Sequence, residues 1–283
     1  EEESIIKSNY ERLKNRKPAI EPADHPVIRN EDACFESSLK AIQIAKKYNT
    51  RLHILHISTE KELQLFGNMM PLAEKRITAE VCVHHLHFTA DDYTMLGNRI
   101  KCNPAIKAAH NKAALWSALL DDRLDIIATD HAPHTLAEKG YIRNDKGELE
   151  LAQTNEGILP YEKAHAGLPL VQHPLQLMLY YVKQGKLSIE KVAEKMSHAP
   201  ATLFRIKERG FLREGYYADM VLVDMNQPYP VSQENILYKS GWSPLEGFVF
   251  NASINYTFVN GNMVYGNNSF DESQKGMRLK FER

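Results

Sequence analysis

The fold of this chain is decided by residues Ile126–His134, which read IIATDHAPH. The segment Asp125–Thr129 is a short apolar run of the type that forms a buried β-strand. Asp130 and two histidines follow at once, so the polarity changes where the predicted strand ends. A carboxylate and imidazoles at the end of a rigid strand suit metal binding and proton transfer, because both groups are basic at neutral pH. A turn with an aspartate cap and surface histidines is the alternative interpretation.

The composition indicates a globular protein that acts on a small molecule. Hydrophobic residues make up 43% of the 283 residues, which is enough for a substantial core. Lysine and arginine total 35 against 36 aspartate and glutamate residues, so the charge balance favours neither nucleic acid nor a membrane surface as a partner. No run approaches the roughly 18 apolar residues of a membrane span, and no signal-type segment opens the chain. Three cysteines without CxxC spacing indicate a reducing compartment, so we expect a cytoplasmic location.

Helical and extended patterns alternate through the first half of the chain. Asn30 is a plausible N-cap for the first clear helix, because acidic residues follow it directly. Thr59 and Glu62 have the spacing of a capping box for a helix after the first strand. This alternation predicts βα units around a parallel sheet. The predicted elements are helices at Asn30–Lys47 and Ala108–Asp122 and strands at Arg51–Ile57, Ile77–Thr89 and Asp125–Thr129.

The strand predicted at Arg51–Ile57 carries two histidines, His53 and His56. They are three residues apart, so their side chains lie on opposite faces of a strand and only one can point into a barrel. His56 is nearer the carboxyl end, where the chemistry of parallel barrels gathers, and it is the predicted metal ligand. A hydrogen-bonded core histidine is the alternative for His56 and the preferred interpretation for His53.

Two strings resemble motifs of the dihydroorotases, which belong to the metal-dependent amidohydrolase superfamily. ATDHAPH, at Ala128–His134, is similar to the motif of their last barrel strand, and HIST, at His56–Thr59, is similar to a motif whose histidine is a zinc ligand. The resemblance implies that Asp130 binds metal and acts as general base and acid, and that His56 binds metal. It also implies a TIM-like (β/α)8 barrel that holds one or two zinc ions.

The strand predicted at Ile77–Thr89 carries three further histidines, His84, His85 and His87. A second metal site is one interpretation of this cluster. The string resembles the dihydroorotase segment AEVTPHHLLLT, whose histidines are not the recognised metal ligands, although Val83 stands where that segment has proline. We therefore interpret the cluster as wall residues and as donors that support the ligands.

Three further segments resemble parts of the family that contact substrate. Lys101–Lys107, KCNPAIK, is similar to a segment whose asparagine contacts substrate, which implies that role for Asn103. It departs from the family pattern by an alanine for the second proline and a lysine for the arginine. HAGLPL resembles a segment that offers backbone groups to substrate, which implies binding by Ala166 and Gly167, with a plain loop as the alternative. His134 is the fourth implied substrate-binding residue.

The pattern changes in the last third of the chain. Residues 1–205 are expected to form the barrel part and residues 206–283 a small β domain with a tail. A strand is predicted at Ala218–Asp224 and a hairpin across Asn260-Gly261, the strongest short-range turn signal in the sequence. These strands and the SPLEG string at Ser243–Gly247 resemble the small β domain of amidohydrolases. Helices are predicted at Pro174–Lys183 and Ser188–His198, with a short helix from Pro200 to Arg205.

The passage 139–157 and the first residues of the chain leave alternatives open. Tyr141–Arg143 and Glu148–Leu151 could form a hairpin that projects over the site, or the passage could be a disordered surface loop. Glu1–Glu3 already look like a helix start. In dihydroorotases such acidic residues follow a metal-binding histidine, so we expect that ligand, the HxH motif and the bridging lysine or aspartate to lie upstream. About half of the roughly 250 residues of a complete barrel would then be outside this chain.

The resemblance implies the reversible hydrolysis of L-dihydroorotate to N-carbamoyl-L-aspartate in pyrimidine synthesis. A hydantoinase or allantoinase is the alternative among enzymes, and the Asn103 and His134 strings favour dihydroorotase over both. A catalytically silent assembly partner is the alternative of another class. Retention of Asp130 and His56 argues against it, because a silent copy has no chemical need for either residue. A small-molecule substrate is the expected partner, and homodimer formation is left open.

Overall fold

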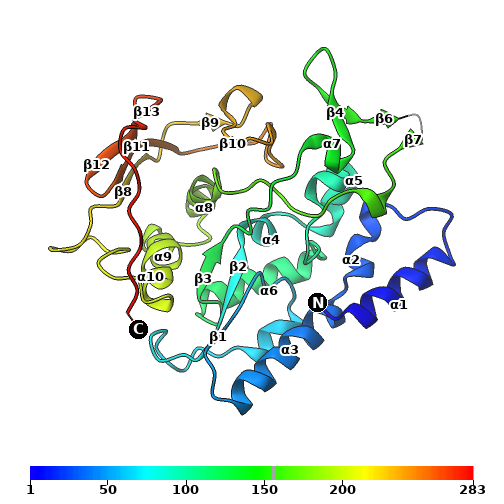
Figure 1. Cartoon of the computed structure of the whole chain (residues 1–283), viewed down its shortest axis with the longest axis horizontal. Helices are drawn as coiled ribbons and strands as arrows, with labels where there is room; N and C mark the ends of the chain where they lie inside the picture. The colour runs from blue at the N-terminus through cyan, green and yellow to red at the C-terminus, as the bar shows by residue number, and fades with distance from the viewer. Residues whose placement is uncertain (155–156, 283) are drawn as a thin grey trace.

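The structure, a computed structural model, describes residues 1–154 and 157–282. Its central element is a parallel sheet in the order β1-β2-β3, which joins Leu52–Ile54, Ile77–Cys82 and Ile126–Ala128. Main-chain registers place Ile54 opposite Ala79 and Val81 opposite Ile127. Because the three strands run in one direction, their carboxyl ends meet at one edge of the sheet (Figure 1). The predicted parallel sheet is confirmed.

The helices surround this sheet and connect its strands (Figure 1). Asn30 caps α3 as predicted, since its side chain accepts a hydrogen bond from the Ala33 N–H at 3.1 Å. The first helices lie on one side of the sheet in this view, and the C-terminal sheet lies on the other. The α-helices are α1 Glu3–Lys14, α2 His25–Ile28, α3 Glu31–Lys47, α4 Val83–His87, α5 Tyr93–Leu96, α6 Ala109–Leu120, α7 Leu136–Lys139, α8 Pro174–Lys183, α9 Ile189–Ala193 and α10 Ala199–Leu203.

Three predicted elements differ in detail from the structure. The strand expected at Arg51–Ile57 ends at Ile54, because the backbone of His56 has φ 42°, which no β-strand accommodates. The strand expected to continue to Thr89 ends at Cys82, and the histidines that follow lie on the short helix α4. Thr59 and Glu62 make their capping contacts, but they precede a 3-10 helix at Lys61–Leu65 instead of an α-helix.

A second sheet is antiparallel and lies near the C-terminus. Its order is β13-β12-β11-β8 (Figure 1). Asn260 and Gly261, with φ 54° and 83°, connect β11 to β12, so the predicted hairpin is confirmed. The strands are β8 Met220–Asp224, β11 Ser253–Val259, β12 Asn262–Gly266 and β13 Ser269–Phe270. Whether this sheet forms a separate domain from residue 206 stays a prediction.

Short two-stranded ladders complete the structure. β4 and β5 form the hairpin that was one interpretation of the passage 139–157, of which residues 155 and 156 lie outside the described residues. The remaining strands are β4 Tyr141–Arg143, β5 Leu149–Leu151, β6 Gln153–Thr154, β7 Gly157–Ile158, β9 Tyr229–Pro230 and β10 Val249–Phe250. No helix in the described part of the chain is long and apolar enough to cross a membrane.

The largest apolar cluster joins the parallel sheet to segments from both halves of the chain. Val81 and Ile127 from neighbouring strands pack in it with Leu119 from α6. Trp242 and Phe250, both fully buried, belong to the same cluster although they come from the last third of the sequence. Trp242 also donates a 2.7 Å hydrogen bond to the carbonyl of His134. The segment after β3 is therefore held in place by a residue from the C-terminal part of the chain.

Candidate active site at the carboxyl ends of the parallel strands

The two predicted metal ligands lie just beyond the carboxyl ends of the outer strands of the parallel sheet. His56 follows β1 by two residues, and Asp130 follows β3 by two residues. The edge where such strands end is the usual place for chemistry in parallel βα folds. Both side chains are half-buried, so each is held by its surroundings and still open to a ligand.

Both residues have left-handed backbone conformations, with φ 42° at His56 and 46° at Asp130. This region is uncommon for residues other than glycine and costs about 1–3 kcal/mol when the surroundings impose it. In each case this conformation occurs two residues after the end of a strand. Strain of this kind gathers at functional sites, and no sequence pattern indicated it here.

The electrostatic surroundings of Asp130 connect it to both other strands. Burial raises the pKa of its carboxyl above the usual value; the nearby His56 lowers it, and Glu80 raises it again. Glu80, a buried residue of β2, accepts a 3.4 Å hydrogen bond from the His56 backbone N–H. Glu80 was not singled out from the sequence, because one glutamate in an apolar strand gives no signal of its own.

His53 is a hydrogen-bonded histidine of the sheet, which is the interpretation that the sequence favoured. Its Nε2 lies 3.0 Å from the Glu80 carboxylate, and its Nδ1 lies 2.9 Å from the Thr78 hydroxyl. Both ring nitrogens are therefore used inside the sheet. By contrast, within the described ranges 1–154 and 157–282, neither the His56 ring nor the Asp130 carboxylate makes a hydrogen bond. A carboxylate and an imidazole are a donor set that fits zinc.

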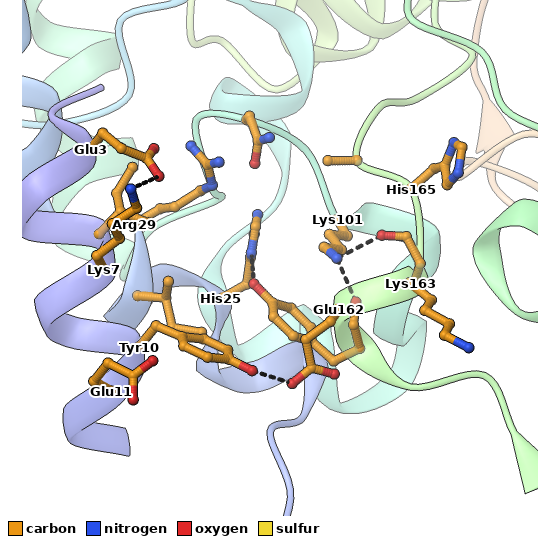
Figure 2. Close-up of a pocket in the computed structure, with 16 residues that line it drawn as sticks. Glu3, Lys7, Tyr10, Glu11, His25, Arg29, Lys101, Glu162, Lys163 and His165 are labelled. Carbon is orange, nitrogen blue, oxygen red and sulfur yellow. Dashed lines mark hydrogen bonds and ion pairs between the residues drawn. The ribbon is translucent and has the colours of Figure 1, made fainter. Parts of the chain in front are cut away.

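Asn103 and Ala166 line a cavity of about 860 Å³ between α1, α2 and the segment around residue 164 (Figure 2). The walls carry cationic groups from Lys7, Arg29 and Lys101. Arg29 is paired with Glu1 at 2.5 Å. His56 lines a separate cavity of about 230 Å³, and Asp130 lines neither of the two. The structure thus brings the two predicted metal ligands, His56 and Asp130, to one edge of the sheet. Two predicted substrate-binding residues, Asn103 and Ala166, line one cavity, and neither metal ligand lines that cavity.

Gly167, the neighbour of Ala166 in the chain, leaves no room for a side chain between its backbone and His134. Gly167 has φ 141°, and a Cβ at this position would lie 2.4 Å from the Ala132 carbonyl oxygen and 3.0 Å from the His134 ring. Only glycine allows such an approach. The Gly167 N–H donates to the Lys101 carbonyl at 2.9 Å, so this group is already used inside the protein. The His134 Nδ1 lies 3.2 Å from the Nδ1 of His165.

Comparison with known proteins shows what family this arrangement comes from. The sequence pattern described as "Amidohydrolase family" matches residues 11–264. The chain belongs to the amidohydrolase family.

Amidohydrolases named dihydroorotase are similar to most of the chain. It is 32% identical over 240 residues to the dihydroorotase of Pyrococcus abyssi, which is 85% of this chain and 52% of that protein. It is also 32% identical to the dihydroorotase of Lactiplantibacillus plantarum, over 89% of this chain and 54% of that protein. The chain therefore spans about half the length of the curated relatives it matches.

A solved hydantoinase structure confirms the fold. The L-hydantoinase of Arthrobacter aurescens superposes with a TM-score of 0.80 and 24% identity, over 95% of this chain and 56% of that protein. The fold is that of a TIM-barrel-like metal hydrolase, as the sequence predicted. Members of the family generally bind a metal, and side chains that could do so are present here.

Two buried lysines of this amidohydrolase hold the segment that contains Ala166 and Gly167. Lys139, fully buried, donates to the carbonyls of Lys101, His165 and Gly167 at 2.8, 2.8 and 3.0 Å. Lys101 donates to the carbonyls of residues 161 and 164, each at 2.6 Å. Burial lowers the pKa of Lys139 to about 7 and that of Lys101 to about 8. These roles were missed from the sequence, since a lysine in a polar passage predicts a surface position.

The histidine cluster divides into two parts. His87 has a partner, the Tyr181 hydroxyl at 2.9 Å, and packs against Phe88. His84 and His85 are buried, and their ligand atoms lie within 4.8 Å of each other and of the Cys82 thiol. A site made of the three histidines is therefore not formed. Burial lowers the pKa of His84 to about 3, so this ring is neutral at physiological pH.

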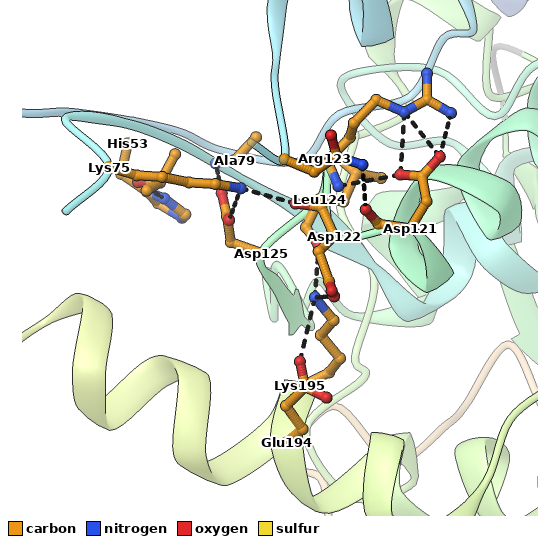
Figure 3. Close-up of polar contacts among 12 residues, drawn as sticks. His53, Lys75, Ala79, Asp121, Asp122, Arg123, Leu124, Asp125, Glu194 and Lys195 are labelled. Atoms are coloured by element: carbon orange, nitrogen blue, oxygen red, sulfur yellow. Dashed lines mark hydrogen bonds and ion pairs between the residues drawn. The ribbon is translucent and has the colours of Figure 1, made fainter. Parts of the chain in front are cut away.

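The amino ends of the strands differ from the carboxyl ends, because buried lysines form ion pairs there (Figure 3). Lys75 contacts the Asp125 carboxylate at 2.7 Å, and that carboxylate also accepts from the Ala79 N–H at 2.8 Å. Lys195, almost fully buried, reaches Asp122 at 2.8 Å from the π-helical turn Glu194–His198. Contacts at the amino ends of the strands stabilise a barrel, whereas the chemistry of a barrel takes place at the carboxyl ends.

Proposed function

We propose that this chain is the C-terminal part of a dihydroorotase, which reversibly hydrolyses L-dihydroorotate to N-carbamoyl-L-aspartate in pyrimidine synthesis. The observation that carries the proposal is the position of His56 and Asp130 beyond the ends of β1 and β3, in strings that resemble dihydroorotase motifs. The similarity to proteins named dihydroorotase, 32% over 85% of the chain, supports the choice of substrate.

Asp130 would move the proton in this reaction. Its carboxylate accepts a proton from the attacking water and donates it to the ring nitrogen as the carbon–nitrogen bond of the cyclic amide breaks. In the reverse direction the same carboxylate takes the proton from the attacking nitrogen. Burial raises the pKa of Asp130, and a carboxylate with a raised pKa is a stronger base.

His56 and Asp130 would hold zinc, as part of a site of one or two ions. When bound, zinc supplies an activated water near neutral pH and polarises the substrate carbonyl. The imidazole of His56 and the carboxylate of Asp130 suit this ion, and both lack other hydrogen-bond partners among the described residues. The left-handed backbone at each residue fixes the direction in which these ligands are presented.

Asn103, His134, Ala166 and Gly167 would position the substrate. The Asn103 amide can donate to and accept from a cyclic ureide, and His134 can donate to the ring carboxylate. The Gly167 N–H already donates to the Lys101 carbonyl, so Gly167 would contribute by the close approach of its backbone and not by this group. The neighbouring residue Ala166 lines the cavity and would offer its main chain to the substrate. The buried Lys139 would keep this segment in place through its three carbonyl contacts.

The remaining features of the proposal concern the whole protein. Residues 1–205 would form part of the barrel and residues 206–283 a small β domain. The protein would be cytoplasmic and act on a small molecule, with a homodimer as its assembly. A hydantoinase or allantoinase is the alternative reaction, and a silent assembly partner is the alternative role.

The test is the turnover of dihydroorotate by the full-length protein and by Asp130→Asn, followed by ultraviolet absorbance. The amide keeps the shape of the side chain but cannot accept the proton, so activity should fall on the order of 10²-fold or more. Asp91→Asn is the matched control, because Asp91 is an exposed aspartate in a 3-10 turn. Near-normal activity of Asp130→Asn, or faster turnover of hydantoin than of dihydroorotate, contradicts the proposal.

A further inference from the structure

Cys82, His84 and His85 form a buried cluster where β2 passes into α4. The Cys82 thiol and one ring nitrogen from each histidine lie within 4.8 Å of one another. The residues are exposed by 0%, 1% and 3%. A thiol and two imidazoles are therefore packed side by side in the interior of the protein, with no carboxylate among them.

The ring nitrogens of this cluster lack partners. Within the described ranges of the chain, both nitrogens of His84 and the Nδ1 of His85 are buried without a hydrogen bond. A buried polar atom without a partner costs about 1–3 kcal/mol, so several in one place need an explanation. His87 on the same helix has a hydrogen-bond partner, so among the three histidines of α4 the deficit is limited to His84 and His85.

A side-chain hydrogen bond prepares His85 to act as a ligand. Its Nε2 donates to the Pro104 carbonyl at 3.1 Å, which leaves the Nδ1 lone pair free. A histidine that binds a metal commonly donates its other N–H to a backbone carbonyl in this way, because the bond fixes the tautomer and the ring direction.

We propose that Cys82, His84 and His85 bind a zinc-like divalent cation. A thiolate with two imidazoles is a ligand set for zinc and other borderline-soft ions, and the absence of carboxylates disfavours magnesium and calcium. The ion would bind the Nδ1 of His85 and one of the two ring nitrogens of His84, and it would link the end of β2 to α4. Three protein ligands leave one tetrahedral position for water or another donor. This site uses neither His56 nor Asp130 as a ligand, although it lies near both, since Asp130 acts electrostatically on Cys82 and His56 acts on His84.

Cobalt(II) tests the site, because a cobalt ion bound to a thiolate gives a ligand-to-metal charge-transfer band in the near ultraviolet and one bound only to nitrogen and oxygen does not. The metal-free full-length protein, titrated with cobalt, should develop this band. Cys82→Ser should abolish it. Cys34→Ser is the matched control and should keep it, since Cys34 is also buried but lies outside the cluster.

A band that survives in Cys82→Ser overturns the proposal. Should that variant fail to fold, X-ray absorption of the zinc-loaded wild type decides, because it must show a sulfur neighbour at about 2.3 Å. A zinc environment of nitrogen and oxygen alone overturns the proposal whatever the variants do. Neither measurement reads dihydroorotate turnover, so failure here and failure of the proposed function are distinguishable.

Discussion

Replacing Gly167 by alanine tests whether the close approach at the cavity is required. The backbone at Gly167 has φ 141°, which L-residues avoid, and the new Cβ would lie 2.4 Å from the Ala132 carbonyl oxygen. That oxygen belongs to the main chain, so it cannot rotate away as a flexible side chain could. The segment must shift, and with it the hydrogen bonds from Gly167 to Lys101 and from Lys139 to Gly167.

The expected loss has two parts. Imposing a left-handed backbone on alanine costs about 1–3 kcal/mol, and overpacking costs about 1–3 kcal/mol more. Gly185→Ala is the matched control, because Gly185 has φ 70° but nothing within 4 Å of a Cβ. It carries the backbone cost alone, of about 1–2 kcal/mol. Gly167→Ala should therefore lower the free energy of unfolding by about 1–3 kcal/mol more than Gly185→Ala does.

Urea unfolding measures the stability of both variants, and dihydroorotate kinetics measure the site. A displacement of about 1 Å in a positioning segment reduces turnover on the order of 10²-fold, so Gly167→Ala should lose activity even where it is folded. Gly185→Ala should keep normal activity. Equal stability losses in the two variants would refute the steric argument, and full activity in a folded Gly167→Ala would refute the positioning role.

Three further predictions concern other residues. Asn103→Ala and His134→Ala should each weaken turnover of dihydroorotate by roughly ten- to a hundredfold, because a hydrogen bond to a charged group contributes about 1.5–3 kcal/mol, and metal content should stay normal in elemental analysis. His56→Ala should lower the zinc retained after dialysis, and unchanged stoichiometry returns His56 to a structural role. Burial lowers the pKa of His173 to about 4, below its unfolded value near 6.5, so its contribution to stability is complete above pH 6.5 and is lost as the pH falls toward 4. His173→Phe should flatten the acid dependence of the unfolding free energy by up to about 1.4 kcal/mol per pH unit in that window, and an unchanged slope contradicts the assignment.

Features that depend on neighbouring residues were predictable from the sequence. The Asn30 cap needs only an oxygen placed three residues before an N–H, and the Asn260-Gly261 turn needs only two residues that accept positive φ. The alternation of helices and strands was equally local. These signals predicted the parallel sheet and the C-terminal hairpin, and the strings around His56 and Asp130 indicated where the chemistry should lie.

Features that depend on distant partners could not be predicted. Lys139 bonds carbonyls that are 26 to 38 residues away, so no local pattern shows that it is buried. The strand at His53 was expected to continue past His56, because residue type alone does not reveal the left-handed backbone there. The Cys82 cluster arises only because β2 ends at Cys82 and a helix begins directly after it.

The two ends of the parallel strands divide stability and function between them. At the amino ends, the pair of Lys75 with Asp125 is buried (Figure 3), and removal of one partner from a buried pair costs about 3–5 kcal/mol. The buried Lys195 adds a contact to the exposed carboxylate of Asp122. At the carboxyl ends, His56 and Asp130 have left-handed backbones, and this strain lowers stability. Strained backbone persists only where the surrounding structure holds it in place. Here the same strands that are fixed at their amino ends lead to the strained residues at their carboxyl ends. The fixed amino ends therefore allow the carboxyl ends to carry strained backbone at His56 and Asp130, the two residues that the proposal makes metal ligands.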